Sequence, residues 1–134
     1  MNVEDYTEIY YRETLGQPVP EVTSGKFVHI AGPVDEYLIL SPRELTKYHA
    51  HIVERFCQIH AGLTCTPAPS GDAALLDQSG WRVCGGGRFR LNRAEQELTL
   101  WDSSKAYGAF DGAHIRNALT KDPDWNRYDV RLGE

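Results

Sequence analysis

Residues 41–62 read SPRELTKYHAHIVERFCQIHAG and carry the clearest helical pattern of the chain. Ser41 and Glu44 have the spacing of a capping box, and Pro42 would occupy the first helical position, so we expect a helix to begin at Ser41. Gly62 stands where a left-handed residue would end such a helix. Apolar residues recur between them at the three- and four-residue intervals of a buried helix face, at Leu45, Tyr48, Ile52, Val53, Phe56 and Ile59.

Short apolar or alternating segments on both sides of this helix have the composition of strands. We expect strands at residues 27–31, 37–40, 63–66, 81–84, 89–91, 97–101 and 128–132, and a second, shorter helix at 112–119. Residues 67–80 are rich in Pro, Ser, Gly and Asp and are expected to form a loop, with one helical turn at 73–76. This order of elements predicts a single α+β domain, in which a mixed β-sheet is flanked by two main α-helices.

The domain is expected to span residues 25–134, preceded by an N-terminal extension at residues 1–24. We expect this extension to be a loop or a short helix. The loop-like part lies around Pro18 and Pro20. A short helix would dock on the core through Tyr6, Ile9, Tyr10 and Tyr11.

The composition favours a soluble, cytoplasmic protein, and a monomer is the default expectation. Of the 134 residues, 41% are hydrophobic, which is enough for a core, and no stretch reads as a signal peptide or a transmembrane helix. The formal net charge of −5 argues against a nucleic acid or an anionic membrane as a partner. The three cysteines, Cys57, Cys65 and Cys84, form no Cys-x-x-Cys pair, which favours a reducing compartment over a disulfide framework or a zinc knuckle.

His49 is the first candidate for a chemical role, because helical spacing puts its imidazole within the apolar stripe. Surroundings of that kind would tune the pKa of the imidazole, as a catalytic group requires. The alternative is a core histidine whose ring is satisfied by a hydrogen bond, and periodicity alone favours that alternative. His51 lies two residues further on, where its side chain does not face that of His49, so a metal site shared by the two is implausible.

Two further segments have the residues to bind an anion. Gly85-Gly86-Gly87 interrupts a strand pattern: either the backbone there closely approaches a ligand or a neighbouring element, with Arg88 available for an anion, or it forms a bulge. Ser103-Ser104-Lys105-Ala106-Tyr107-Gly108 lies between a predicted strand and a predicted helix, where small residues can expose backbone N–H groups as an anion-binding nest. The alternative for this segment is an ordinary connecting loop.

Other catalytic patterns are absent from the sequence. His29, His60 and His114 do not have the spacing of metal ligands. The chain has no His-Glu-x-x-His, Walker, Gly-x-Ser-x-Gly or Cys-x5-Arg motif. We therefore expect neither a metal nor a cofactor.

Four segments occur together in a particular order: Lys26-Phe27-Val28, Tyr48-His49-Ala50, Gly85-Gly86-Gly87-Arg88 and Ser104-Lys105-Ala106-Tyr107-Gly108. Over about residues 26–130, this series resembles the janus/ocnus-type protein-histidine phosphatases, a family of small metal-independent enzymes whose fold is a mixed sheet with two helices. Two positions depart from the family pattern. Ser41 stands where the family often has a basic residue, with Arg43 two residues on, and Ser103 stands where it often has an aromatic one.

The resemblance implies that His49 is the catalytic residue, as a general base or as a nucleophile. It implies that backbone N–H groups at His49–Ala50 and Ser104–Ala106 hold the phosphate. The residues that it implies bind phosphate are Lys26, Ala50, Arg88, Ser104, Lys105 and Ala106. The implied reaction is hydrolysis of phosphohistidine, and of similar N-phosphorylated residues, in a protein substrate without a metal or a cofactor.

Two other functions are compatible with the same residues. The pocket would also suit a module that binds phosphate or a phosphoprotein without turnover. A hydrolase of a small phosphoramidate or phosphoester metabolite is the second alternative. Phosphate binding without hydrolysis would favour the binding module, and a comparison of phosphohistidine protein with small substrates would separate the two kinds of enzyme.

Overall fold

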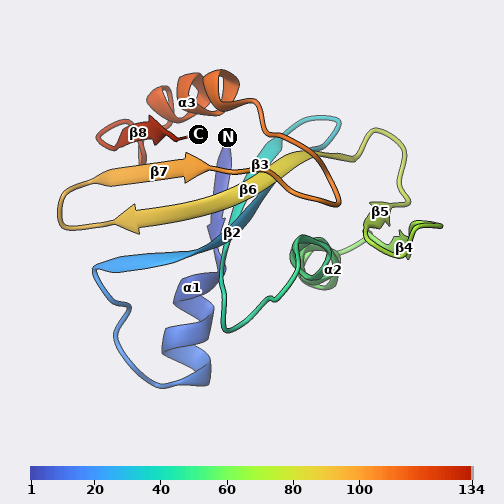
Figure 1. The fold of residues 1–134 in the computed structure, drawn as a ribbon, viewed down its shortest axis with the longest axis horizontal. Coiled ribbons are helices and arrows are strands. Elements are labelled where there is room, and N and C mark those ends of the chain that lie inside the picture. Colours follow the sequence, from blue (N-terminus) through green and yellow to red (C-terminus); the bar gives the residue numbers. More distant parts are fainter. Residues whose placement is uncertain (134) are drawn as a thin grey trace.

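The strands form one large sheet and one small sheet (Figure 1). The computed structural model describes residues 1–133. The strands are β1 (Asn2–Asp5), β2 (Val22–Ala31), β3 (Glu36–Pro42), β4 (Cys65–Pro67), β5 (Ala74–Leu76), β6 (Arg82–Asn92), β7 (Glu97–Trp101) and β8 (Asp129–Leu132). The helices are α1 (Tyr6–Ile9), which continues as a π-helical turn over Tyr10–Thr14, α2 (His49–Ile59) and α3 (Gly112–Thr120).

The large sheet is mixed and has the strand order β1-β3-β2-β6-β7-β8. The outer pairs, β1 with β3 and β7 with β8, are parallel. The three inner pairings are antiparallel. Strands β4 and β5 form the separate two-stranded sheet. The α+β fold with a mixed sheet and two main helices, expected from the sequence, is thereby confirmed.

The large sheet separates two hydrophobic clusters, each covered by helices. On one face, Ile115 and Leu119 of α3 pack with Phe27 of β2. On the other face, Phe56 of α2 packs with Val28 of β2, and α1 adds to the same cluster. Figure 1 shows α3 on one side of the strands and both α1 and α2 on the other. Because side chains alternate along a strand, the adjacent residues Phe27 and Val28 of β2 belong to opposite clusters.

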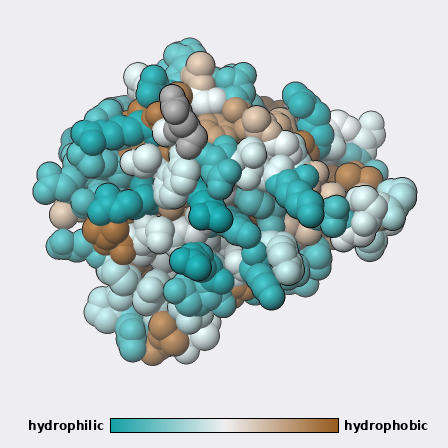
Figure 2. Space-filling model, viewed as in Figure 1, coloured by the Kyte–Doolittle hydropathy of each residue, from teal (hydrophilic) through white to brown (hydrophobic). Residues whose placement is uncertain are grey.

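The face shown in Figure 2 is mainly hydrophilic, with small and separate hydrophobic patches. Most of the large apolar side chains are instead buried in the two clusters. Within residues 1–133, no helix is both long enough and apolar enough to cross a membrane.

The main helix begins later than the capping-box pattern predicts. α2 starts at His49, and residues 43–48 form turns and bends. Ser41 belongs to β3, where it pairs with Lys26 of β2, and the hydroxyl of Thr46 donates to Ser41 Oγ over 2.6 Å. Strand pairing and this buried contact outweigh a capping preference of about 1 kcal/mol. The helix predicted to begin at Ser41 is therefore wrong over its first eight residues, 41–48.

Several shorter segments also differ from the prediction. Asn2–Asp5, expected to lie in a loop or helix ahead of the domain, forms an edge strand of the large sheet, and Tyr6 after it is buried as expected. Residues 74–76, expected as a helical turn, pair with β4 as a strand. The glycines at 85–87 do not interrupt β6, which is continuous. Gly62, after α2, has the left-handed conformation expected of it, with a φ of 84°.

Phe56→Ala is expected to lower the free energy of unfolding by about 3–5 kcal/mol, because it opens a cavity under α2 in a fully buried position. Urea denaturation followed by circular dichroism measures the change. Ile59→Ala is the matched control: Ile59 is the last residue of the same helix and is half exposed, so the expected change is within about 0.5 kcal/mol. Equal losses for the two variants would contradict the packing described here.

Candidate functional site

A pocket of about 600 Å³ lies where the start of α2, strands β2 and β6 and the turn after β7 meet. Gly71 and Asp72, between β4 and β5, also line it, so five separate segments of the chain meet here and only the tertiary fold brings them together. Six of the residues singled out in the sequence line the pocket: Lys26, His49, Ala50, Arg88, Lys105 and Ala106.

His49 is the first residue of α2, and its ring is held against the sheet. Its side chain is almost fully buried, and its Nε2 lies 2.9 Å from the carbonyl oxygen of Gly87. Because a carbonyl oxygen can only accept a hydrogen bond, Nε2 must carry the proton, and the neutral ring then has its lone pair on Nδ1. Among residues 1–133, Nδ1 of His49 has no hydrogen-bond partner, yet it is not sealed off from solvent. The nitrogen that can react is thus the one left free.

The glycine at position 86 allows the His49 ring to lie this close to β6. A methyl group there would be 3.0 Å from His49 Cδ2 and 2.6 Å from the carbonyl oxygen of Phe27. Any side chain at this position would displace the ring or the strand. The strand pairing also shifts register between His29 and Ile30, opposite the start of the glycine run. The sequence left two explanations open for the glycine run, close approach of a neighbouring element or a bulge. The structure shows close approach at Gly86 and a register shift next to the run.

The surroundings of His49 keep its imidazole neutral near pH 7. Burial lowers the pKa of His49 below its ordinary value of 6.5. The hydrogen bond to Gly87 opposes this shift, and the positive charge of Lys26 adds to it. A neutral imidazole with an unoccupied nitrogen can accept a proton or attack an electrophile.

Three basic side chains line the same pocket. Lys26 Nζ donates to the carbonyl oxygen of Lys47 at 2.7 Å, and an ammonium group has two further protons to donate. Arg88 Nε lies 3.3 Å from a carboxylate oxygen of Asp102, and Lys105 projects from the turn after β7. The pocket is also bordered by the acidic residues Glu54, Asp72 and Asp102. Charge in the pocket is therefore mixed, with basic groups supplied by three of its five segments.

The turn after β7 is closed by two backbone hydrogen bonds between Ser104 and Gly108, of 3.0 and 2.7 Å. Ser104 Oγ accepts from the N–H of Tyr107 at 3.1 Å, and Ser104 is only 3% exposed. Ser104 therefore shapes the turn and does not line the pocket. Lys105 and Ala106 do line it, and neither of their N–H groups donates to another of residues 1–133.

Tyr107 anchors this turn to the small sheet. Its hydroxyl donates to the carbonyl oxygen of Ala74 and accepts from the N–H of the same residue, both at 2.8 Å. Burial raises the pKa of Tyr107 to about 12, so the hydroxyl stays protonated. The anchoring role of Tyr107 could not be predicted from the sequence, because the pattern around Ala74 indicates a helical turn and not a strand.

A second hollow, of about 660 Å³, adjoins the His49 pocket and shares Lys26 and Arg88 with it. It is also lined by Arg43 and Arg90, and it contains no histidine. Arg43, the basic residue two positions after Ser41, thus lines this second hollow and not the His49 pocket.

A scan against protein-family models finds no match to this chain, and a search of curated proteins finds no significant match.

His49 is expected to titrate below pH 6.5 in the folded protein, as measured by NMR of its ring protons. Because the unfolded chain then binds more protons than the folded one, the free energy of unfolding is expected to rise with pH between the folded-state pKa of His49 and 6.5. Urea denaturation across this range measures the slope, and His49→Gln should reduce it. A pKa of His49 at or above 6.5 would contradict the burial described here.

Proposed function

We propose that this protein hydrolyses the phosphoramidate bond of phosphohistidine in protein substrates without a metal, and that His49 carries the reaction. The observation that supports this most strongly is the free Nδ1 of a neutral His49 in a pocket that also holds Lys26, Arg88 and Lys105. The resemblance of four short segments to janus/ocnus-type protein-histidine phosphatases supports the same residues by a separate route.

Backbone N–H groups and one ammonium group are the proposed phosphate ligands. The first N–H groups of α2, at His49 and Ala50, lack acceptors within the helix and lie at the positive end of its dipole, as in other anion sites. Lys105 and Ala106, whose N–H groups donate to no other of residues 1–133, line the same pocket. Lys26 adds a full positive charge with two free protons. Together these donors would stabilise the charge that develops on the phosphoryl oxygens.

His49 acts through Nδ1 in either of two forms of the mechanism. As a general base, it accepts a proton from water while the water oxygen bonds to phosphorus; the P–N bond breaks, its electron pair passes to the leaving imidazole nitrogen, and that nitrogen takes up a proton. As a nucleophile, Nδ1 bonds to phosphorus while the P–N bond of the substrate breaks and the leaving imidazole nitrogen takes its electron pair and a proton. Water then hydrolyses the phosphohistidine formed at His49, and this second step releases phosphate and restores the free ring. In both forms the carbonyl of Gly87 holds Nε2–H and stabilises the positive charge that the ring gains.

The central experiment is hydrolysis of a phosphohistidine-bearing protein in the presence of EDTA. Wild type is expected to release phosphate, and His49→Ala is expected to lose about a hundredfold or more in rate, the usual contribution of a positioned acid–base group. His60→Gln is the matched control, because His60 pairs with Glu4 outside the pocket and should leave the rate unchanged. Full activity in His49→Ala, or loss of wild-type activity with EDTA, would overturn the proposed chemistry.

Other outcomes of this assay lead to the alternative functions. Binding of the phosphoprotein without hydrolysis by the wild type would favour a phosphate-binding module. Faster hydrolysis of a small phosphoramidate or phosphoester than of the phosphoprotein would favour a metabolite hydrolase. The first outcome contradicts a catalytic role for His49, and the second contradicts the proposed substrate.

Lys26→Ala is expected to weaken the binding of inorganic phosphate by about tenfold or more, because it removes a charged hydrogen-bond donor worth about 1.5–3 kcal/mol. Isothermal titration calorimetry measures the dissociation constant. Lys121→Ala, which removes the same charge just after α3, is the control and should leave it unchanged. Equal effects of the two variants would show that net charge, and not the pocket, sets the affinity.

A further inference from the structure

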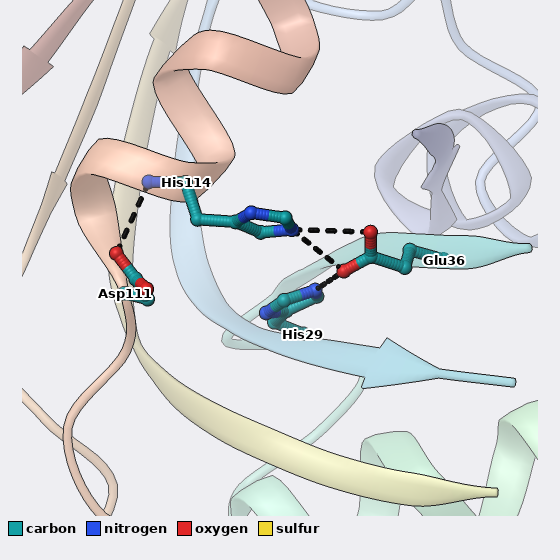
Figure 3. A network of polar contacts seen from close by, with 4 residues as sticks. All are labelled: His29, Glu36, Asp111 and His114. Atoms are coloured by element: carbon teal, nitrogen blue, oxygen red, sulfur yellow. Dashed lines mark hydrogen bonds and ion pairs between the residues drawn. The ribbon is translucent and has the colours of Figure 1, made fainter. Parts of the chain in front are cut away.

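His29, Glu36 and His114 bring their side chains together on the face of the large sheet that carries α3 (Figure 3). Nε2 of His29 lies 2.7 Å from Oε1 of Glu36. Nε2 of His114 lies 2.8 and 3.1 Å from the two oxygens of the same carboxylate. The two imidazole nitrogens and the carboxylate all lie within 4.8 Å of one another. None of the three residues lines the His49 pocket.

Three different elements build this cluster. The antiparallel pairing of β2 with β3 places Ala31 opposite Glu36, so Glu36 reaches diagonally to His29 on the same hairpin. Asp111 caps α3 by accepting the N–H of His114 at 3.1 Å, which fixes where the first turn of that helix lies. The two rings then stack with centroids 5.6 Å apart and direct both Nε2 atoms to the carboxylate (Figure 3).

Two imidazoles and one carboxylate form a ligand set that suits a zinc ion. Around a tetrahedral zinc ion, neighbouring ligand atoms lie about 3.3 Å apart, as follows from metal–ligand distances of about 2.0–2.1 Å. Nε2 of His29 and Nε2 of His114 would each need to move away from Oε1 of Glu36 by about half an ångström to reach this spacing. His114 and Glu36 are both partly exposed, so an ion there would keep positions open to water.

Two features of the surroundings limit the affinity of the cluster for a metal. Nδ1 of His29 is buried without a partner, so coordination by Nε2 would leave the proton on Nδ1 without an acceptor among residues 1–133, which lowers the affinity. The positive charge of Arg82, near His29, opposes a second cation and limits the affinity.

We propose that His29, Glu36 and His114 form a zinc site that ties α3 to the β2–β3 hairpin. The site has three protein ligands from three elements, with its remaining positions open to solvent. Its expected dissociation constant is in the micromolar range, weaker than that of a closed four-ligand structural site. The site does not depend on the proposed phosphatase reaction, because none of its three residues lines the His49 pocket.

The test is titration of the metal-free, full-length protein with zinc chloride by isothermal titration calorimetry at neutral pH. One ion is expected to bind per chain. His114→Ala and Glu36→Gln are expected to raise the dissociation constant at least about tenfold, because each removes a ligand. His114 is partly exposed and Glu36→Gln keeps its shape, so both variants should stay folded, as circular dichroism will show.

His60→Gln is the matched control, since His60 and Glu4 form a second histidine–carboxylate pair with Nε2 and Oε2 2.7 Å apart. It should bind zinc as the wild type does. Zinc should also raise the melting temperature of the wild type more than that of His114→Ala, because only the native state holds the site. No zinc binding by the wild type, or equal binding by wild type, His114→Ala and Glu36→Gln, would overturn the proposal, as would a loss of binding in His60→Gln.

Discussion

The hydrogen bond between the ring of His49 and the carbonyl of Gly87 ties the start of α2 to the centre of the sheet, and it also decides which ring nitrogen can react. It forms only because β6 has no side chain at Gly86, where a methyl group would meet the ring. The turn after β7, anchored through Tyr107, closes the same pocket from the other side. The packing of the His49 ring against Gly86 and Gly87 thus also sets its chemistry, because a ring whose Nε2 is hydrogen-bonded has only Nδ1 free for a ligand.

Much of the fold could be predicted from the sequence, because it depends on local patterns. The alternation in Glu97–Trp101 and the helical spacing in Gly112–Thr120 appear in the structure almost as expected. The start of α2 could not be predicted, because Ser41 is both a good helix cap and a residue that pairs with Lys26 in the sheet. The strand at Asn2–Asp5 is too short to show a pattern, and only its pairing partner in β3 makes it a strand.

The candidate site was predictable only in part, for a similar reason. Short motifs pointed to His49 and to the turn after β7, and the fold brings both into one pocket. The burial of Ser104 could not be seen, because it depends on hydrogen bonds across the turn. The approach of His114 to His29 has no sequence signal at all, since it is set by how α3 lies over the sheet.

The proposed reaction depends on the tautomer of His49, and long-range proton–nitrogen NMR of the imidazole rings measures that tautomer directly. At neutral pH the spectrum should show Nε2 protonated and Nδ1 as an unprotonated nitrogen, and added inorganic phosphate should shift the Nδ1 resonance. A His49 ring that carries its proton on Nδ1, or that is doubly protonated at neutral pH, would contradict the proposed mechanism, because Nδ1 of His49 would then not be free to react.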